Sequence, residues 1–330
     1  MREPVDAVIT WVDGYEKAHA DKLTHYLTRM GIVNTPEAAS PTRFNQCGEI
    51  DYCVKSILRF APWIRSIYIV TDAQRPAIIE QFVGTPEEEK IKLIDHRDIF
   101  RGYEDCLPTF NSMTIECMLW RIPGLSNQFI YLNDDCAIVR PVAYEDFFRE
   151  GKIVLRGHWR AQSDRKWGRY LQRFINKLFN TSYQFVQRDQ FRTIEENTAK
   201  RAGWPNHFFE FQHGPFSLKR DSFEEHFSQH PEMWSQNLLY PLRDQQQFWP
   251  ISLIDHLEIK KKNVVFDHSL AAIMVNGGFH SSNKIQLRLA EAENKKQVAF
   301  VCFQSVDEAS SEVQTSMMGW LDNQINRGNL

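Results

Sequence analysis

The stretch FIYLNDDCAI, residues 129–138, places two adjacent carboxylates at the end of a short apolar run. Four apolar or aromatic residues lead directly into Asn133, Asp134 and Asp135, a pattern typical of a buried strand that ends in a polar turn. Asn and Asp favour turns, but carboxylates at a strand end also bind metal ions or act in catalysis. Other parts of the sequence are needed to distinguish a simple turn from a metal-binding or catalytic site.

Two other apolar runs also end in an aspartate. Residues 5–12, VDAVITWV, lead to Asp13, and residues 64–70 lead to Asp72. In open α/β sheets, ligands bind at the carboxyl ends of the strands. We therefore expect the three acidic strand ends to share one edge of a sheet, although a turn or a helix cap explains each of them separately at least as well.

Segments with a helical spacing of apolar residues alternate with these strands. This alternation predicts an α/β fold with a parallel or mostly parallel sheet that is covered by helices. The expected helices are residues 15–30, 49–60, 111–121 and 313–325, the further strands are residues 91–94 and 298–304, residues 180–262 are expected to be mostly helical, and residues 264–280 irregular.

The composition excludes several classes of protein. The 330 residues, 42% apolar and 25% charged, suit one large globular domain or two modest ones. A net charge of −3 provides no field that attracts nucleic acid, so we expect no nucleic-acid partner. No apolar run approaches the roughly 18 residues of a membrane span, and the N-terminus lacks the apolar core of a secretory signal. We therefore expect a cytoplasmic protein.

The residue types available for binding phosphate and metal point to a hard cation. The six cysteines include no CxxC pair, which indicates reduced thiols rather than a disulfide framework or a zinc site. Carboxylates at strand ends suit Mg²⁺ bound together with a diphosphate. Neither a Walker A loop nor a GxGxxG motif is present, so cationic side chains must bind the phosphate. The candidates are Arg43, Lys55, His213 and Arg243, each of which alone is more often structural or solvated.

Pro215 follows closely after His213 and predicts a fixed turn that would hold the imidazole in place. A buried, hydrogen-bonded structural histidine would give the same pattern. On residue chemistry alone, we expect a metal-assisted transferase that acts on a phosphorylated substrate. A non-enzymatic module with a calcium site is the alternative, which is disfavoured because the aspartate spacing does not match an EF-hand loop.

Residues 165–179 carry a basic amphipathic pattern, with cations between apolar residues at helical spacing. Three uses are open. The helix could lie in a membrane interface, its aromatic face could pack on the domain with the basic face in solvent, or it could bind a phosphate-bearing acceptor. The second use is the default for such a helix.

Four stretches of the sequence resemble the Stealth family of sugar-1-phosphate transferases, which includes bacterial capsule polymerases and the GlcNAc-1-phosphotransferase of lysosomal enzyme tagging. They occur in the family's order and directly cover nearly half of the chain. The segments APWIRSIYIVTDAQRP and IPGLSNQFIYLNDD are the most specific. The four stretches are residues 5–14, the block of residues 43–76 and 93–135, residues 212–223 followed by Arg243, and, more weakly, residues 298–308.

The resemblance implies a Rossmann-like, GT-A-like α/β fold with a helical insertion and a defined reaction. An acceptor hydroxyl attacks the β-phosphate of a UDP-sugar, the sugar 1-phosphate is transferred to a saccharide or lipid-linked saccharide, and UMP is released. We then expect residues 1–150 to bind the nucleotide sugar, residues 151–262 to form the acceptor side, and residues 263–330 to return to the core of one catalytic unit.

The resemblance also assigns roles to residues at the matching positions. His213 is expected to be the base and Arg243 to bind phosphate. Asp135 is expected to hold Mg²⁺ or Mn²⁺, and Glu116 to support the site or act as an alternative base. Among the substrate-binding candidates, Asn133 also shapes the turn that aims the aspartate. The remaining substrate-binding candidates are Trp11, Asp13, Arg43 and Lys55.

This chain departs from the family pattern at two positions. Gln304 and Ser305 replace the usual Asn-Asp pair, so Asp307 is the candidate for a second metal ligand. Lys55 and Ser56 replace an Arg-Ser pair, which keeps the charge but loses the forked geometry. Because the chain also lacks the large inserts of the lysosomal enzyme, it best matches a bacterial capsule or exopolysaccharide enzyme.

Two alternatives remain open at this point. A metal-dependent glycosyltransferase would use the same UDP-sugar but release UDP, and a carbohydrate-binding protein would have no turnover. For residues 165–179, the hypothesis is peripheral contact with the inner face of the membrane or with a lipid-linked acceptor.

Overall fold

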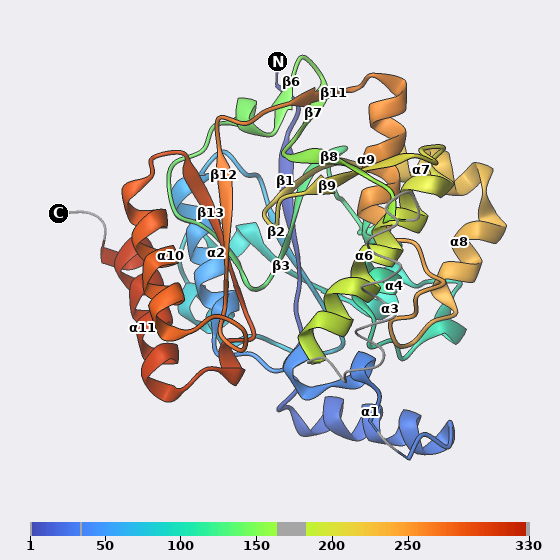
Figure 1. Cartoon of the computed structure of the whole chain (residues 1–330), viewed down its shortest axis with the longest axis horizontal. Coiled ribbons are helices and arrows are strands. Elements are labelled where there is room, and N and C mark those ends of the chain that lie inside the picture. The colour runs from blue at the N-terminus through green and yellow to red at the C-terminus, as the bar shows by residue number, and fades with distance from the viewer. Residues whose placement is uncertain (1, 34, 164–182, 328–330) are drawn as a thin grey trace.

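The structure, a computed structural model, describes residues 2–33, 35–163 and 183–327. Its central sheet has five strands in the order β10-β4-β1-β2-β3 (Figure 1). Strands β4, β1, β2 and β3 are parallel, and β10 is antiparallel to β4. The strands are β1 (Val5–Thr10), β2 (Ile67–Thr71), β3 (Ile91–Asp95), β4 (Gln128–Asn133) and β10 (Phe216–Lys219).

The three inner strands of the central sheet, β4, β1 and β2, are mostly apolar and are buried on both faces. Every residue of β2 is buried, and only the last residue of β1 and of β4 is partly exposed. A mostly parallel sheet with helical cover confirms the predicted fold class. The helices are α1 (Lys17–Arg29), α2 (Glu49–Phe60), α3 (His96–Ile99), α4 (Ser112–Glu116), α6 (Tyr183–Arg201), α7 (Arg220–Gln229), α8 (Pro231–Leu238), α9 (Pro250–Lys261), α10 (Ser282–Asn294) and α11 (Ser311–Asp322).

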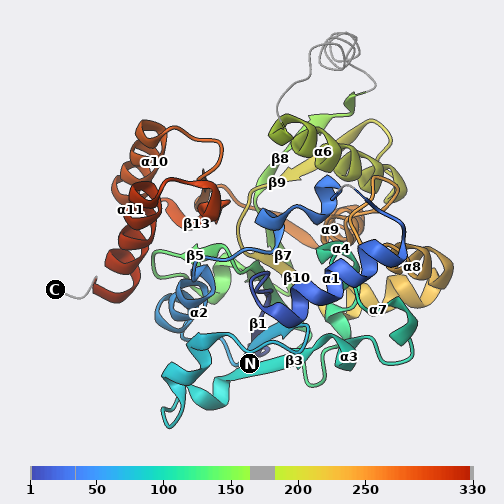
Figure 2. The same cartoon turned by 90° about the horizontal axis from the view of Figure 1, so that it is seen from below.

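A smaller sheet in the order β12-β13-β5 lies beside α10 and α11 (Figures 1 and 2). It consists of β12 (Ala271–Asn276), β13 (Val298–Gln304) and β5 (Cys136–Ile138). The prediction that residues 264–280 are irregular is therefore wrong. Residues 271–276 pair in parallel with β13, and residues 264–266 pair with a further strand, at residues 152–155. β12 was missed because it begins with two alanines, which are depleted in strands.

The segment of residues 151–262 also contains strands that its helical texture conceals. β7 (Lys152–Leu155) pairs with β6 (Phe148–Arg149) and with β11 (Val264–Phe266), while β8 (Gly157–Ala161) pairs with β9 (His207–Phe211). With β10 in the central sheet, this segment contributes strands as well as helices to the fold. The proposed division into three parts remains a prediction.

Two predicted helices have different ends in the structure. Residues 111–121 form α4, which begins after Asn111 because its side chain accepts a hydrogen bond from the Met113 amide, and a separate 3-10 turn at Leu119–Arg121. Helix α11 begins at Ser311, after the cap residue Ser310. The predicted basic helix at residues 165–179 lies outside the described residues.

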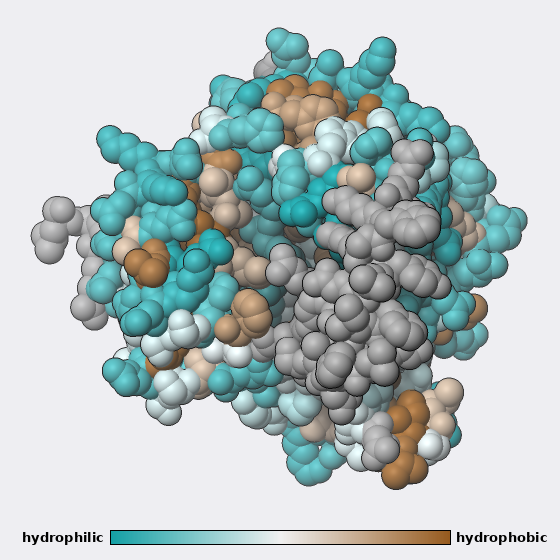
Figure 3. Space-filling view, viewed as in Figure 1, coloured by the Kyte–Doolittle hydropathy of each residue, from teal (hydrophilic) through white to brown (hydrophobic). Residues whose placement is uncertain are grey.

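Outside the grey area of Figure 3, this face is mostly hydrophilic, with hydrophobic residues in separate patches. Among the described residues, no helix combines the length and the apolar character needed to cross a membrane.

Candidate functional site

The three acidic strand ends do lie along one edge of the central sheet. β1 pairs in parallel with β4 on one side and with β2 on the other, in a register that places Thr10 opposite Asn133 and Val70. The residues that follow these ends, Asp13, Asp72 and the Asp134–Asp135 pair, therefore share the carboxyl edge of the sheet, as the sequence predicted. Asp72 is already engaged, since its Oδ2 lies 2.7 Å from Lys22 Nζ beside a cavity of about 350 Å³.

Asp135 lies in the two-residue turn between β4 and β5, next to His213. Burial raises the pKa of the Asp135 carboxyl, while a thiol hydrogen bond from Cys302 and the charge of His213 act in the opposite direction. The carboxylate oxygen Oδ1 lies 3.4 Å from Cys136 Sγ. The main-chain oxygen of Asp135 accepts a hydrogen bond of 2.8 Å from the Phe303 amide. The structure thus brings together two of the four predicted catalytic residues.

The other two predicted catalytic residues, Glu116 and Arg243, form a second group, in which the charge of each acts on the other. The Tyr131 hydroxyl lies 3.2 Å from Glu116 Oε1 and 2.9 Å from Asn133 Oδ1, so it links α4 to the end of β4. Burial raises the pKa of Glu116 to about 7, although the positive charge of Arg243 opposes this shift. Arg243 Nη2 donates to Ser112 Oγ at 3.0 Å.

Arg43 lies close enough to Arg243 to affect its ionisation. Burial and, to a smaller extent, the charge of Arg43 lower the pKa of Arg243 to about 10. Arg43 Nη2 is 3.1 Å from Glu37 Oε1, which balances part of this positive charge. Two guanidinium groups beside one buried glutamate form a suitable environment for a phosphate group.

The end of β1 is fixed by contacts that the sequence did not reveal. Gln74 accepts a hydrogen bond from the Asp13 amide at 3.0 Å and donates to the Asp13 carbonyl at 2.8 Å. The Gly14 amide donates to the Phe44 carbonyl at 2.7 Å, and a Cβ at Gly14 would lie 2.7 Å from Phe44 Cβ. Trp11 is buried, and its indole nitrogen has no hydrogen-bond partner among the described residues.

Lys55 lies apart from the other candidates. It is located in α2, where its charge acts on Asp51 one turn earlier, and Asp51 in turn accepts a hydrogen bond from Gln81. For the described residues, no contact links Lys55 to Asp135, Glu116 or the guanidinium groups. Its role as a substrate-binding residue remains a prediction.

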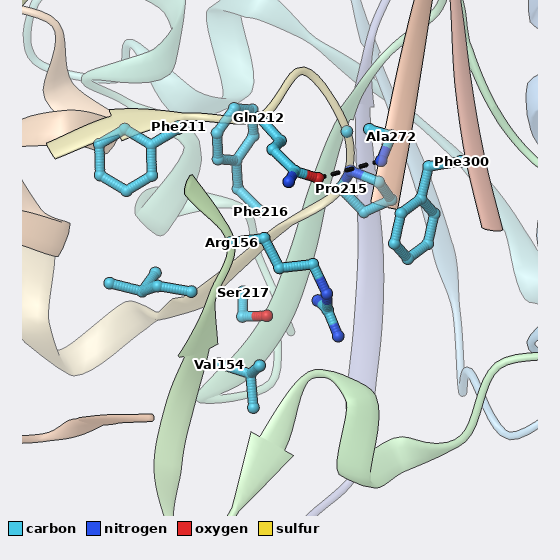
Figure 4. A pocket seen from close by; sticks show the side chains of 11 residues that line it. Val154, Arg156, Phe211, Gln212, Pro215, Phe216, Ser217, Ala272 and Phe300 are labelled. Atoms are coloured by element: carbon cyan, nitrogen blue, oxygen red, sulfur yellow. Dashed lines mark hydrogen bonds between the residues drawn. The ribbon is translucent and has the colours of Figure 1, made fainter. Parts of the chain in front are cut away.

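A tight connection between β9 and β10 holds His213. The Gln212 amide donates to the Arg156 carbonyl at 3.0 Å, and Gln212 Oε1 accepts from the Ala272 amide at 3.0 Å, shown as a dashed line in Figure 4. Pro215 lies beside Phe300 in the same view. A small cavity of about 20 Å³ behind this turn has room for about one water molecule. The turn expected around Pro215 is therefore tied to β12 and to Arg156, the residue between β7 and β8.

Several carboxylates surround Asp135, and one of them was missed in the sequence. Burial raises the pKa of Glu49, the first residue of α2, to about 6, and the charges of Asp135 and Asp307 act in the same direction. The Asp307 carboxylate accepts hydrogen bonds of 2.9 Å from Thr42 Oγ1 and from Asn45 Nδ2. An acidic residue in the first turn of a helix usually interacts with the helix dipole, which concealed this role of Glu49.

This donor set fits a hard divalent cation. Burial raises the pKa of Asp134 well above its usual range, and the charges of Asp135 and Glu49 add to that shift. Partly buried carboxylates that repel one another would be stabilised by a cation between them, and oxygen donors are the ligands that Mg²⁺ and Mn²⁺ prefer.

Comparisons with known proteins give a family model and several relatives that match parts of the chain. A family model described as Stealth protein CR2, conserved region 2, matches residues 43–155. An exopolysaccharide phosphotransferase of Lactiplantibacillus plantarum is 30% identical over 246 residues, which cover 70% of this chain and 68% of that protein. An exopolysaccharide phosphotransferase of Streptomyces coelicolor is 45% identical over 145 residues, which cover 44% of this chain and 15% of that protein.

The chain spans half or less of the length of several curated relatives that it matches. Among solved structures, the galactosyltransferase LgtC in complex with donor and acceptor sugar analogs aligns with 98% of this chain and all of its own, at 11% identity and a TM-score of 0.49.

Proposed function

The chain belongs to the Stealth family, and on this premise we propose that it transfers a hexose 1-phosphate or N-acetylhexosamine 1-phosphate from a UDP-sugar to a saccharide hydroxyl. The acceptor oxygen forms a bond to the β-phosphorus, and the bond from that phosphorus to the bridging oxygen breaks. The products are a phosphodiester and UMP. The proposed setting is the synthesis of a bacterial surface polysaccharide, which is supported by relatives that are named exopolysaccharide or capsular polysaccharide phosphotransferases.

The observation that carries the proposal is the meeting of Asp135 and His213 at the carboxyl edge of the sheet. In-line phosphoryl transfer needs a base for the hydroxyl, positive charge around the phosphate and a fixed geometry. His213 takes the proton of the acceptor hydroxyl, and the tied turn from Gln212 to Pro215 fixes its position. Glu116, with a pKa of about 7, is the alternative base.

Arg243 and Arg43 bind the phosphate oxygens in this proposal. Asp135, with Asp134 and Glu49, would hold Mg²⁺ or Mn²⁺, which supplies positive charge to the diphosphate when bound. Asp307, whose oxygens accept bonds from Thr42 and Asn45, is the further candidate ligand. Trp11, Asp13, Asn133 and Lys55 are the proposed contacts to the nucleotide sugar.

The acceptor side is proposed to include residues 151–262. The basic, amphipathic sequence of residues 165–179 supports contact with an anionic membrane surface or with a lipid-linked acceptor at the inner face of the membrane. Liposome co-sedimentation tests this part. Binding that ignores both anionic lipid and charge reversal of Arg169 and Arg173 would contradict it.

The nucleotide that is released tests the proposed reaction. The purified chain is incubated with a panel of UDP-sugars and saccharide acceptors, and both products are identified by mass spectrometry. UMP together with a phosphodiester is the expected result. Release of UDP would instead identify a glycosyltransferase, and turnover that is absent from the whole panel would favour a carbohydrate-binding protein.

Two variants and one control connect this reaction to the site. Asp135→Asn and His213→Ala should each lower kcat by at least about 100-fold, as expected for loss of a metal ligand or of a base. Asp21→Asn, at an exposed position of α1 that pairs with Lys17, should leave kcat unchanged. Full activity of either site variant would exclude the assigned role.

A further inference from the structure

Two cysteines face each other beside Asp135. Cys136 of β5 and Cys302 of β13 are directly opposite partners in an antiparallel pair. The neighbouring positions are hydrogen-bonded, since the Phe303 amide donates to the Asp135 carbonyl at 2.8 Å. The cysteines therefore occupy a non-hydrogen-bonded pair, where opposite side chains approach most closely. Their thiols are both buried and both free.

The ligand atoms of this group have the spacing of a metal site. The two Sγ atoms and a carboxylate oxygen of Asp135 all lie within 4.8 Å of one another. Tetrahedral zinc, with Zn–S bonds of about 2.3 Å and Zn–O bonds of about 2.0 Å, separates its ligand atoms by about 3.5–3.8 Å. The distance from Cys136 Sγ to Asp135 Oδ1 is 3.4 Å, which already falls close to that value.

We infer that Asp135, Cys136 and Cys302 form a binding site for a thiophilic divalent cation of the Zn²⁺ class, with water in the fourth position. Thiolate ligands select Zn²⁺ over Mg²⁺, which prefers oxygen donors. Binding of the ion releases the protons of the two thiols. The partly exposed side of Asp135 gives the ion access from the edge of the sheet.

Other buried cysteines of the chain do not have this arrangement. Cys117 Sγ accepts a hydrogen bond of 3.1 Å from Asn237 Nδ2, and Cys53 Sγ donates to the Asn133 carbonyl at 3.8 Å. Neither belongs to a group of ligand atoms within 4.8 Å among the described residues. Cys117 is therefore a matched control, because it is equally buried but belongs to no group of three ligand atoms with the spacing of a metal site among the described residues.

One consequence rests on the proposed function. If Asp135 holds Mg²⁺ or Mn²⁺ during transfer, a thiophilic ion that takes the same carboxylate displaces the activating ion. Zn²⁺ should then inhibit the transfer in competition with Mg²⁺, and a chelator followed by Mg²⁺ should restore it. Binding of the ion itself does not depend on the reaction.

Cobalt titration of the full, reduced chain tests the site without any substrate. Co²⁺ is the probe, because its absorption shows a charge-transfer band when thiolates bind it, and Zn²⁺ is then added to displace it. One Co²⁺ per chain with a thiolate band is expected, and Zn²⁺ should remove the band. Titration of free thiols before and after the experiment establishes that both cysteines remain reduced.

Cysteine-to-alanine variants identify the ligands without adding a buried hydroxyl. Cys136→Ala and Cys302→Ala should each weaken Co²⁺ binding by at least about tenfold, the scale on which even outer residues affect metal sites. The double variant should lose the thiolate band, whereas Cys117→Ala should keep it. Circular dichroism checks that each variant is folded.

A wild-type protein without a thiolate band, or a folded double variant that retains it, would overturn the inference. Failure of the proposed phosphotransfer gives a different result, since the Co²⁺ band would persist in a protein that releases no UMP.

Discussion

Replacing Glu116 by glutamine is expected to change how the stability of the protein depends on pH. Glu116 is buried in α4, and burial raises its pKa from 4.5 to about 7. A difference of about 2.5 between the folded and unfolded pKa values corresponds to a free energy of about 3.4 kcal/mol. Glutamine has nearly the same shape and cannot ionise, so the variant removes this term and little else.

The direction in which the free energy of unfolding changes with pH follows from proton binding. Between pH 4.5 and pH 7 the folded protein holds the Glu116 proton more tightly than the unfolded chain does. The free energy of unfolding of the wild type therefore falls as the pH rises through this range, and the fall levels off above about pH 7. With the two pKa values above, the loss between pH 5 and pH 8 is about 2.5 kcal/mol.

Urea denaturation of both proteins at pH 5 and pH 8 measures this difference. Every other ionisable group is common to the two proteins, so its contribution cancels in the comparison. Glu116→Gln should gain about 2.5 kcal/mol relative to the wild type between the two pH values. A difference that does not change with pH, or that changes in the opposite direction, would refute the conclusion that burial raises the pKa of Glu116.

Three further predictions concern the turn after β1, the hydroxyl beside Glu116 and the metal. Gly14→Ala should lower the thermal midpoint, because the new Cβ would lie 2.7 Å from Phe44 Cβ. Gly319→Ala in α11 should leave the midpoint equal or higher, because alanine has the higher helix propensity and the new Cβ would meet no atom within 4 Å other than the backbone of its own helix. Equal shifts of the midpoint in the two variants would contradict this reasoning. Tyr131→Phe removes a hydroxyl 3.2 Å from Glu116 Oε1. Loss of a hydrogen bond to a charged group, worth about 1.5–3 kcal/mol, should lower kcat by at least about tenfold. An unchanged kcat would show that Tyr131 does not contribute to the reaction. Treatment with EDTA should abolish UMP release and Mg²⁺ or Mn²⁺ should restore it, so release that resists EDTA would exclude the proposed cation.

The sequence predicted the central sheet well because its strands carry a strong local signal. The runs that became β1, β2 and β4 are short, apolar and β-branched, and their order along the chain predicted parallel neighbours. β12 carries a weaker signal, because it begins with two alanines, which are depleted in strands. Local pattern thus predicts the strands that are rich in β-branched and aromatic residues, and is less reliable where a strand begins with small residues.

Some residues of the candidate site were predicted from the sequence, and others were not. The meeting of Asp135 with His213 was implied by the family resemblance, since no spacing in the sequence brings the β4–β5 turn to the β9–β10 connection. Glu49 was missed because its position in the first turn of α2 had an ordinary explanation. Lys55, six residues later, is rotated by about 240° around the helix from Glu49, so helical geometry already argued against placing both in one site.

The connection between β4 and β5 explains why the carboxylates can remain together despite their burial. β4 ends at Asn133 in the central sheet, and β5 begins at Cys136 in the smaller sheet, so Asp134 and Asp135 span the passage between two sheets. Pairing on both sides fixes the ends of this two-residue turn and leaves its side chains little freedom to separate. The fold therefore imposes the repulsion that a cation would relieve. A substitution that weakens the pairing of β5 with β13 should then disturb the site as directly as a substitution of Asp135 itself.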